Sequence, residues 1–236
     1  EELLAKELTQ LGAQDVKIGI RNVSFTGDKG FMYKANLALR TAIKILKPIA
    51  KFSVKNETEL YQKIKNIRWE DYLNKDGSLA VGATLSGDRF THSQFIALKT
   101  KDAIVDRFRD KEGRRPDVDL DLPSLRINIH IDRNICTLSL DSSGQSLHKR
   151  GYKVANTMAP INEVLAAGII MLAGWNGQCD LLDPMCGSGT ILTEAAMIAC
   201  NIPPNLNRDE FAFENWLDFD VDLYELIENA ALKKIR

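Results

Sequence analysis

Apolar positions in the first 50 residues alternate between helix and strand spacings. The first leucines recur at three- and four-residue steps and are followed by Gly12, a residue suited to a helix C-cap. Strands are expected over residues 16–20 and 23–25. A longer helix is expected from Phe31 to Leu46, where Pro48 ends it. This order predicts part of a small α+β layer.

The middle of the chain repeats this alternation with longer elements. The predicted elements are, in order, a helix capped by Thr58 and running to Ile64, a strand over 79–85, a helix over 92–109 and strands over 125–131 and 135–140. The short link 132–134 makes the last two strands a hairpin.

The pattern after residue 158 is different. An apolar helix is expected over residues 160–175, with Pro160 in its opening turn. The short run Cys179–Asp183 is apolar enough for a buried parallel strand, and residues 190–200 form the next predicted helix. The sequence therefore predicts a strand, a glycine loop and a helix in series.

Composition narrows the class of protein. The chain is 44% hydrophobic and 27% charged, the balance of a globular protein, and no run of about 18 apolar residues predicts a membrane span. The four cysteines form no C-x-x-C pair and have no matching histidine cluster, so we expect no metal site. Reduced cysteines favour a cytoplasmic protein.

Charge is distributed unevenly along the chain. Lys and Arg exceed Asp and Glu by 3 in residues 1–50 and by 4 in residues 51–153, whereas residues 154–236 carry 4 basic and 12 acidic side chains. A nucleic-acid contact is therefore expected before about residue 153. The excess is modest, and an ordinary solvated surface explains it equally well.

The most specific motif is the octet Asp183-Pro-Met-Cys-Gly-Ser-Gly-Thr190, between the predicted strand and helix. Its two glycines allow a tight turn and close approach of a ligand, and the following helix offers free amides and a positive dipole end. The octet lacks the lysine of a Walker A loop and the third glycine of a dinucleotide fingerprint. A bare G-x-G is also found in ordinary turns, so the alternatives stay open on spacing alone.

The complete octet resembles the cofactor loop of the amino-methyltransferases that modify RNA. Residues 144–153 are similar to the segment that joins a THUMP domain to the catalytic domain in the rRNA and tRNA guanine-N2 methyltransferases. Residues 159–167 resemble the helix before the first strand of those enzymes, and Lys99–Asp106 resembles a THUMP signature. The resemblance covers nearly the whole chain and is densest over residues 86–216.

This resemblance implies both a fold and a domain order. The fold class is an α+β ferredoxin-like and THUMP front part, followed by the beginning of an α/β Rossmann-like methyltransferase domain. Residues 1–52 would form the trimmed ferredoxin-like domain, 53–150 the RNA-binding THUMP domain and 151–236 the incomplete methyltransferase domain. The cofactor would be S-adenosyl-L-methionine and the partner structured RNA, either rRNA or tRNA. The oligomeric state stays open.

The resemblance also implies the site residues. Those expected to bind the cofactor are Asp183, Pro184, Met185, Cys186, Gly187, Ser188, Gly189 and Thr190, with Asn156, Thr157 and Pro160 on the other side. Those expected to bind RNA are Lys99, Lys101, Lys149, Arg150, Tyr152 and Lys153. A solvated linker with Tyr152 in the core is the alternative for the last four.

The sequence departs from the family in its catalytic loop. An Asn/Asp-Pro-Pro-Tyr/Phe loop that grips the guanine amine is not found, and Asn201–Pro204 lacks the aromatic residue and more simply ends a helix. We therefore expect a chain cut before that loop and inactive alone, with no catalytic residue of its own. The parent protein would methylate the N2 amine of a guanosine, and 23S rRNA is its expected substrate. A tRNA methyltransferase, a non-catalytic RNA-binding module and a DNA adenine methyltransferase are the alternatives.

Overall fold

The structure is a computed structural model that describes residues 1–153 and 160–236, and the chain divides into two compact units. Unit 1 consists of Glu1–Ile45, Gln145–Phe211 and Asp220–Arg236, and unit 2 consists of Leu46–Gly144 and Ala212–Phe219. The backbone therefore passes between the units four times. Among the described residues, no helix is long and apolar enough to cross a membrane.

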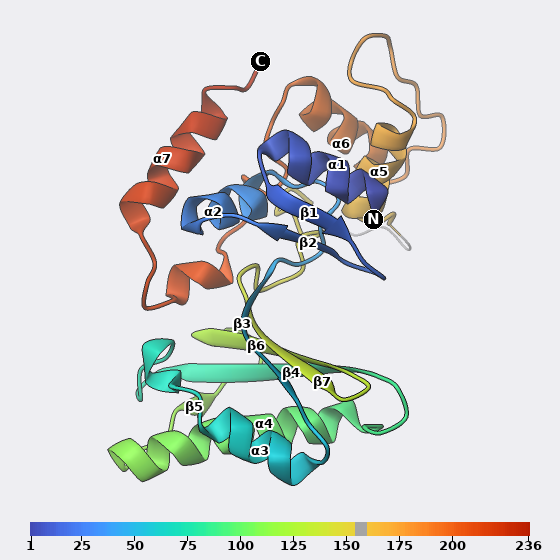
Figure 1. Cartoon of the computed structure of the whole chain (residues 1–236). Helices are drawn as coiled ribbons and strands as arrows, with labels where there is room; N and C mark the ends of the chain where they lie inside the picture. The colour runs from blue at the N-terminus through green and yellow to red at the C-terminus, as the bar shows by residue number, and fades with distance from the viewer. Residues whose placement is uncertain (154–159) are drawn as a thin grey trace. The chain divides into compact units, whose positions relative to one another are not determined.

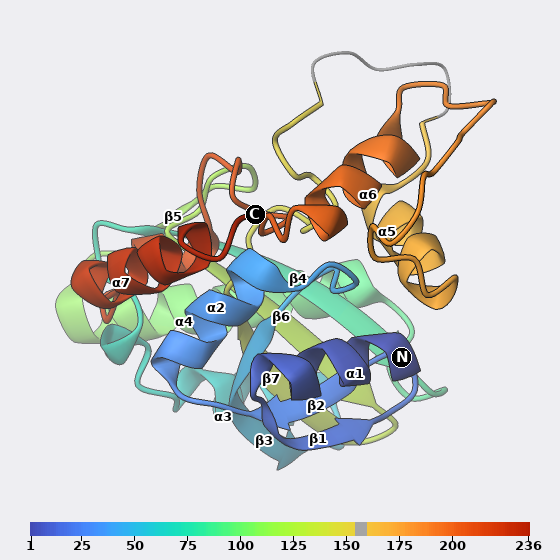
Figure 2. The ribbon, with the colours of Figure 1, turned by 90° about the horizontal axis from the view of Figure 1, so that it is seen from above.

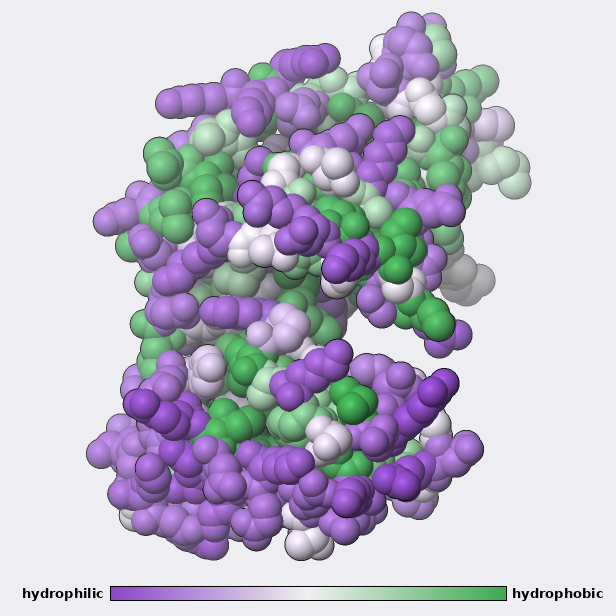
Figure 3. Space-filling model, in the orientation of Figure 1, coloured by the Kyte–Doolittle hydropathy of each residue, from purple (hydrophilic) through white to green (hydrophobic). Residues whose placement is uncertain are grey.

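Unit 2 is a five-stranded sheet with two helices against one face (Figure 1). The strands lie in the order β3-β7-β6-β4-β5. The elements are β3 (Leu46–Ser53), α3 (Glu57–Lys65), the 3-10 turn η1 (Trp69–Asp71), β4 (Ser78–Ser86), α4 (Ser93–Glu112), β5 (Asp117–Val118), β6 (Leu125–Asp132) and β7 (Ile135–Asp141). Figure 3 shows mainly hydrophilic side chains over the helical side of this unit.

Alternating burial fixes the register of this sheet. Ile127, Ile129 and Ile131 of β6 are buried, whereas the residues between them are half-buried and polar. A shift by one residue would turn these isoleucines to the other face, so burial of one face specifies the pairing. The β6–β7 hairpin predicted from the sequence is confirmed, and Arg133 in its two-residue turn has a positive φ of 55°.

The segment Ala212–Phe219 belongs to unit 2, although about 70 residues of chain separate it from the end of β7. It contains the 3-10 turn η2 (Ala212–Asn215). The backbone N–H of Phe213 donates to the carbonyl of Ser142 at 3.1 Å, and the rings of Phe213 and Phe219 lie 5.9 Å apart. Phe213 is completely buried and Trp216 is 6% exposed. The rings of Phe213 and Trp216 therefore extend the core formed by the sheet.

Unit 1 combines both ends of the chain with the region that contains the octet Asp183–Thr190. Its elements are α1 (Glu2–Leu11), β1 (Gln14–Ile18), β2 (Val23–Thr26), α2 (Lys29–Ala38), α5 (Glu163–Leu172), α6 (Thr190–Ala199) and α7 (Val221–Leu232). Strands β1 and β2 form an antiparallel pair, α5 packs beside α6, and α7 packs beside α2 (Figures 1 and 2). Gly12 caps α1 in the left-handed conformation, as the sequence predicts.

The predicted helix from Phe31 to Leu46 is wrong beyond Ala38. The backbone N–H groups of Arg40 and Thr41 donate to the Glu7 carboxylate at 2.8 and 2.9 Å, instead of to helical carbonyls. The chain then enters β3, and Pro48 lies in this strand. Because β3 is at the edge of the sheet and has a register shift after Pro48, the missing N–H there is tolerated.

Two further sequence predictions are corrected. Helix α3 is capped by Asn56, whose side chain accepts from the Glu59 N–H at 2.8 Å, rather than by Thr58. The strand predicted over Cys179–Asp183 is not formed, and these residues are exposed or half-buried. A buried parallel strand needs a neighbour on at least one edge, and strands β1–β7 of the described residues are all paired elsewhere.

The buried ring of Phe213 predicts a measurable contribution to stability. We expect Phe213→Ala to destabilise unit 2 by about 3–5 kcal/mol, because the substitution removes a fully buried ring and leaves a cavity. Urea unfolding followed by circular dichroism measures the loss. Leu217→Ala in the same segment is the control, since Leu217 is 47% exposed and its loss should cost about 0.5 kcal/mol. Equal effects of the two substitutions would remove Ala212–Phe219 from the core.

Candidate functional site

The octet forms a compact loop stabilised by its own side chains and backbone. The Asp183 carboxylate accepts from the Met185 N–H at 3.1 Å, which folds the first half into a turn. The Gly189 N–H donates to the Cys186 carbonyl at 2.8 Å and closes the second half. Gly187 and Gly189 have φ values of 53° and 72°, a left-handed conformation that favours glycine. The glycines are therefore required by the backbone of this loop.

The loop leads directly into the N-terminus of α6. Gly189 is the N-cap and supplies no side-chain hydrogen bond to the first turn of the helix. The first amides of a helix have no partner within it, so they and the helix dipole favour a negatively charged or hydrogen-bond-accepting group. A Cβ atom built on Gly187 or Gly189 would meet no other atom within 4 Å, so this side of the loop is open. This geometry fits a ligand held by backbone amides.

The remaining residues that the sequence predicts to bind the cofactor differ from one another in exposure. Met185 is 88% exposed at the tip of the loop, Pro184 is exposed, and Thr190 is buried with its hydroxyl 3.1 Å from that of Ser188. Pro160 is exposed. Asn156 and Thr157 lie outside the residues that the structure describes.

A buried ion pair holds the helix that follows the loop. Arg150 and Glu194 are both fully buried, and the Arg150 Nε donates to Glu194 Oε1 at 3.1 Å. Arg150 also donates to the carbonyls of Leu147 at 3.2 Å and Arg40 at 2.7 Å, and to Asn205 Oδ1 at 3.3 Å. Every side of the guanidinium is thus used inside unit 1.

The same pair connects segments that are far apart in the sequence. The Arg40 guanidinium donates to the carbonyl of Met197 in α6, at 3.1 Å, and to that of Ile202, at 2.7 Å. Asn205 donates to the carbonyl of Asn36 in α2 at 2.7 Å. Burial lowers the pKa of Arg40, while the nearby Glu194 acts in the opposite direction. The network therefore ties α2, the linker after residue 144 and α6 into one body.

Tyr152 completes this network at the carboxylate. Its hydroxyl donates to Glu194 Oε1 at 3.0 Å. Burial raises the pKa of the Tyr152 phenol, and the Glu194 charge raises it further, so the phenol remains a donor. Burial also raises the pKa of Glu194, and the opposing effects of Arg150 and Tyr152 favour its ionised form.

The structure separates the residues that the sequence grouped as RNA-binding in the linker. Lys149 is exposed, whereas Lys153 is mostly buried, 2.8 Å from the Glu163 carboxylate. Arg150 is not at the surface, because its charge is neutralised by Glu194, and so it is not placed to contact phosphate. Tyr152 is half-buried in the same network, as the alternative interpretation of this segment anticipated.

The two predicted THUMP lysines lie in unit 2 on α4. The Lys99 ammonium is 5.1 Å from the ring centroid of Tyr61, and the Lys101 ammonium is 2.6 Å from the Asp102 carboxylate. Both side chains are partly exposed. Their contact with RNA stays a prediction.

Glu194 was missed by the sequence reasoning, although a signal for it exists. It is the single charged residue in Thr190–Ala199, a helix that is otherwise apolar or neutral. A lone carboxylate on such a helix needs a partner when buried, and Arg150 is in the most basic part of the linker. Nothing in the local sequence pairs the two residues, because 44 positions separate them.

Three known family models match successive parts of the chain. Residues 1–46 match the RlmL ferredoxin-like domain, residues 54–141 the THUMP domain, and residues 150–235 the RMKL-like methyltransferase domain. The chain therefore combines, in this order, the ferredoxin-like domain of RlmL, a THUMP domain and an RMKL-like methyltransferase domain. The family and the fold class predicted from the sequence are confirmed.

Two curated members of this family are named Ribosomal RNA large subunit methyltransferase K/L. The protein of Syntrophotalea carbinolica is 43% identical over 99% of this chain, and that of Cellvibrio japonicus is 44% identical over 98%. The chain spans 34% and 31% of their lengths, and 60% of a Synechocystis relative that is 43% identical.

Several solved structures share the fold of this chain. A protein of Listeria monocytogenes, described as a predicted N6-adenine-specific DNA methylase, has a TM-score of 0.88 at 33% identity, over all of this chain and 61% of its own. SMU.472, crystallised in complex with SAH, has a TM-score of 0.86 at 33% identity, over 99% of this chain and 62% of its own. TrmN from Thermus thermophilus, 22% identical with a TM-score of 0.67, shares the fold.

The Arg150–Glu194 pair predicts strong coupling between the two positions. We expect Arg150→Met and Glu194→Leu each to destabilise unit 1 by about 3–5 kcal/mol, because each leaves one buried charge without its partner. The double variant should lose much less than the sum of the two. Denaturant unfolding of the four proteins measures this difference.

An exposed pair provides the matched control for this cycle. Arg114 and Asp76 lie 2.5 Å apart with side chains 65% and 57% exposed, and removing them should leave the unfolding midpoint nearly unchanged. Strictly additive losses at Arg150 and Glu194 would contradict the role given to the buried pair.

Proposed function

We propose that this chain provides the RNA-binding part and the cofactor loop of an S-adenosyl-L-methionine-dependent methyltransferase. The reaction is methylation of the exocyclic N2 amine of a guanosine in structured RNA, with 23S rRNA as the substrate, in the cytoplasm. The observation that carries the proposal is the loop Asp183–Thr190, with left-handed glycines and the uncapped N-terminus of α6. The names of the Syntrophotalea and Cellvibrio relatives support the substrate class.

The chemical groups of the loop, namely backbone amides and a carboxylate, match those that this cofactor needs. Backbone amides around Gly187 and Gly189 can hold the carboxylate of its methionine part, and the open side of the glycines gives it room. In this proposal the Asp183 carboxylate, which accepts from the Met185 N–H within the loop, would also accept from the amine of the cofactor. When bound, the cofactor supplies an electrophilic methyl group, so the protein's contribution is to position the acceptor amine in line with it.

The network behind the loop has a positioning role in this proposal. Arg150, Tyr152 and Glu194 fix α6 from the side opposite the solvent, so the loop at its N-terminus starts from a rigid helix. Rigid support matters because a misplacement of about 1 Å at a reacting centre can cost about 100-fold in rate. The catalytic residues themselves are not assigned within this chain.

Other substrates are distinguished by a direct comparison. The description of the Listeria relative favours DNA adenine as the acceptor, whereas the THUMP domain favours RNA. Tritium transfer from the labelled cofactor to 23S rRNA, to tRNA and to duplex DNA, catalysed by the protein at the full length of its relatives, separates these cases. Nucleoside analysis of the product identifies the methylated base. A non-catalytic RNA-binding module is the outcome if no substrate is labelled.

Cofactor binding is tested at the loop itself. We expect SAH to slow alkylation of Cys186, because the cofactor covers the loop that contains it, and to leave Cys179 unaffected. Both thiols are exposed, so Cys179 is an internal control for reagent access. Peptide mass spectrometry after brief iodoacetamide treatment measures both rates, and calorimetric titration of SAH gives the affinity.

These cofactor measurements are made on this chain and on a longer protein that includes the remaining length of its relatives. Binding to the longer protein alone places further cofactor contacts outside this chain. If SAH binds neither protein and protects no thiol, the proposed activity is wrong and RNA binding alone remains.

We expect Lys149, which is exposed, to contact RNA directly. Arg150 is buried and paired with Glu194, so we expect no direct contact with RNA from it. We expect Lys149→Ala to weaken binding to structured RNA and to reduce the slope of log K against log salt by about 0.7–0.9, the effect of one phosphate contact. Filter binding across a salt series measures it. Lys6→Ala, at an exposed lysine of α1, is the control. An unchanged slope for the Lys149 variant would remove this residue from the RNA footprint.

A further inference from the structure

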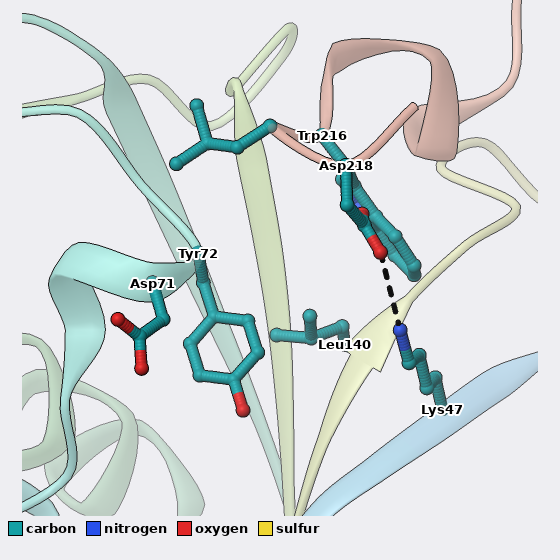
Figure 4. Close-up of a pocket in the computed structure, with 7 residues that line it drawn as sticks. Lys47, Asp71, Tyr72, Leu140, Trp216 and Asp218 are labelled. Carbon is teal, nitrogen blue, oxygen red and sulfur yellow. Dashed lines mark ion pairs between the residues drawn. The ribbon is translucent and has the colours of Figure 1, made fainter. Parts of the chain in front are cut away.

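A small cavity of unit 2 lies where the segment Ala212–Phe219 meets the sheet. It has a volume of about 80 Å³ and is lined by Lys47, Asp71, Tyr72, Leu140, Trp216, Leu217 and Asp218. Figure 4 shows Tyr72 on one side, Trp216 with Lys47 and Asp218 on the other, and Leu140 between them. All of these residues belong to unit 2, so the cavity is a feature of that unit alone.

The base of the cavity is apolar and aromatic, and its rim is charged. Trp216 is 6% and Leu140 2% exposed, whereas the side chains of Lys47 and Asp218 are 44% and 51% exposed. An apolar base with a few polar groups around the opening is the usual arrangement of a small-molecule site. The volume is too small for a whole nucleotide, so only one planar ring or its edge can enter, with the rest of the ligand outside.

Trp216 provides the second, independent sign of a ligand. Its indole N–H is buried and has no hydrogen-bond partner among the described residues. The other two tryptophans satisfy this group, since Trp69 donates to the Ile64 carbonyl and Trp175 to the Cys179 carbonyl, both at 2.9 Å. A buried donor without an acceptor costs about 1–3 kcal/mol, so an acceptor supplied by a ligand would recover that loss.

The charges on the rim exclude the simpler ligands. A cation is disfavoured because the Lys47 ammonium already lies 5.4 Å from the Trp216 ring centroid and 3.7 Å from the Asp218 carboxylate. An anion such as phosphate is disfavoured because two acidic residues, Asp71 and Asp218, are among the residues that line the cavity. A neutral, planar ligand that carries both donors and acceptors satisfies all of these groups.

We infer that this cavity binds a single unstacked nucleobase of RNA that carries both an amino group and a carbonyl oxygen, namely guanine or cytosine. The base stacks against the aromatic wall, its carbonyl accepts from the Trp216 N–H and the Lys47 ammonium, and its amino group donates to the Asp218 carboxylate, because that of Asp71 is paired with Arg68. Uracil lacks the amino group and adenine lacks the carbonyl. Splayed, stacked bases are the usual targets of sequence-specific RNA recognition. This inference rests on the proposed RNA binding and adds base selectivity to it.

The three tryptophans allow a site-resolved test on the whole chain. Uniformly ¹⁵N-labelled protein gives one indole N–H signal for each tryptophan, and GMP, CMP, AMP and UMP are titrated separately. We expect GMP or CMP to move the Trp216 signal saturably, and AMP and UMP to move it much less. The Trp69 and Trp175 signals should stay in place and report that both units remain folded.

Variants of the lining residues connect the signal to the cavity. Tyr72→Leu removes the stacking wall and should weaken the binding of GMP or CMP about 5- to 150-fold. Lys47→Met should weaken it as well, while Tyr72→Phe, which keeps the ring, should retain most of the affinity. Phe52→Leu and Lys51→Met, toward the other end of β3, are the matched controls and should bind as the original chain does.

The outcomes distinguish this inference from the proposed function. A Trp216 signal that does not move with GMP or CMP, or that moves equally with all four nucleotides, overturns the nucleobase site. RNA binding with an unchanged Trp216 signal also overturns the site but leaves the proposed function intact. Failure to bind any RNA would contradict the proposed function, and the mononucleotide titration would still decide the cavity.

Discussion

The arrangement of unit 1 depends on one buried ion pair, between Arg150 and Glu194. Burying two charges costs several kcal/mol for each ion, so the pair is tolerated only when hydrogen bonds satisfy the remaining donors and acceptors. Here Arg40, Leu147, Asn205 and Tyr152 provide them. These groups come from three separate segments, namely the residue after α2, the linker after residue 144 and the loop after α6, so the pair constrains all three together with α6. A geometry so tightly specified holds α6, and with it the loop that precedes the helix, in one position.

This ion pair changes the role that can be assigned to the basic residues of the linker. By composition, the cations after residue 147 predict a surface for phosphate. In the structure only Lys149 remains exposed, whereas Arg150 and Lys153 are paired with carboxylates of α6 and α5. The linker therefore supports α6 and the octet that precedes it, and contributes one exposed cation, Lys149, to the surface. Net charge along a sequence cannot separate these two roles, because it does not show which charges are neutralised by distant partners.

The sequence predicted most of what depends on local pattern. The hairpin of β6 and β7, strand β4, helix α4 and the glycine loop before α6 were placed correctly, since their periodicity, turn residues and caps lie within a few positions of each element. The errors came from distant partners. Glu7 takes the backbone donors that would have extended α2, and the strand expected at Cys179–Asp183 has no neighbour in the described residues. The conformation of the octet was predictable from its glycines, whereas the Glu194 network required contacts across 44 positions.

The path of the chain between its units also depends on contacts between residues that are distant in the sequence. The segment Ala212–Phe219 lies within the residues that match the RMKL-like methyltransferase domain, yet its buried rings belong to the core of the unit that contains the THUMP domain. A division of the chain at residue 150 would therefore remove Phe213 and Trp216 from the core of this unit, and Leu140, which lines the same cavity as Trp216, would become more exposed. It would also open the cavity next to Trp216. The residues matched by the two family models thus share one core, to which Phe213 and Trp216 contribute, and Trp216, Leu217 and Asp218 of the same segment also line its candidate base-binding site.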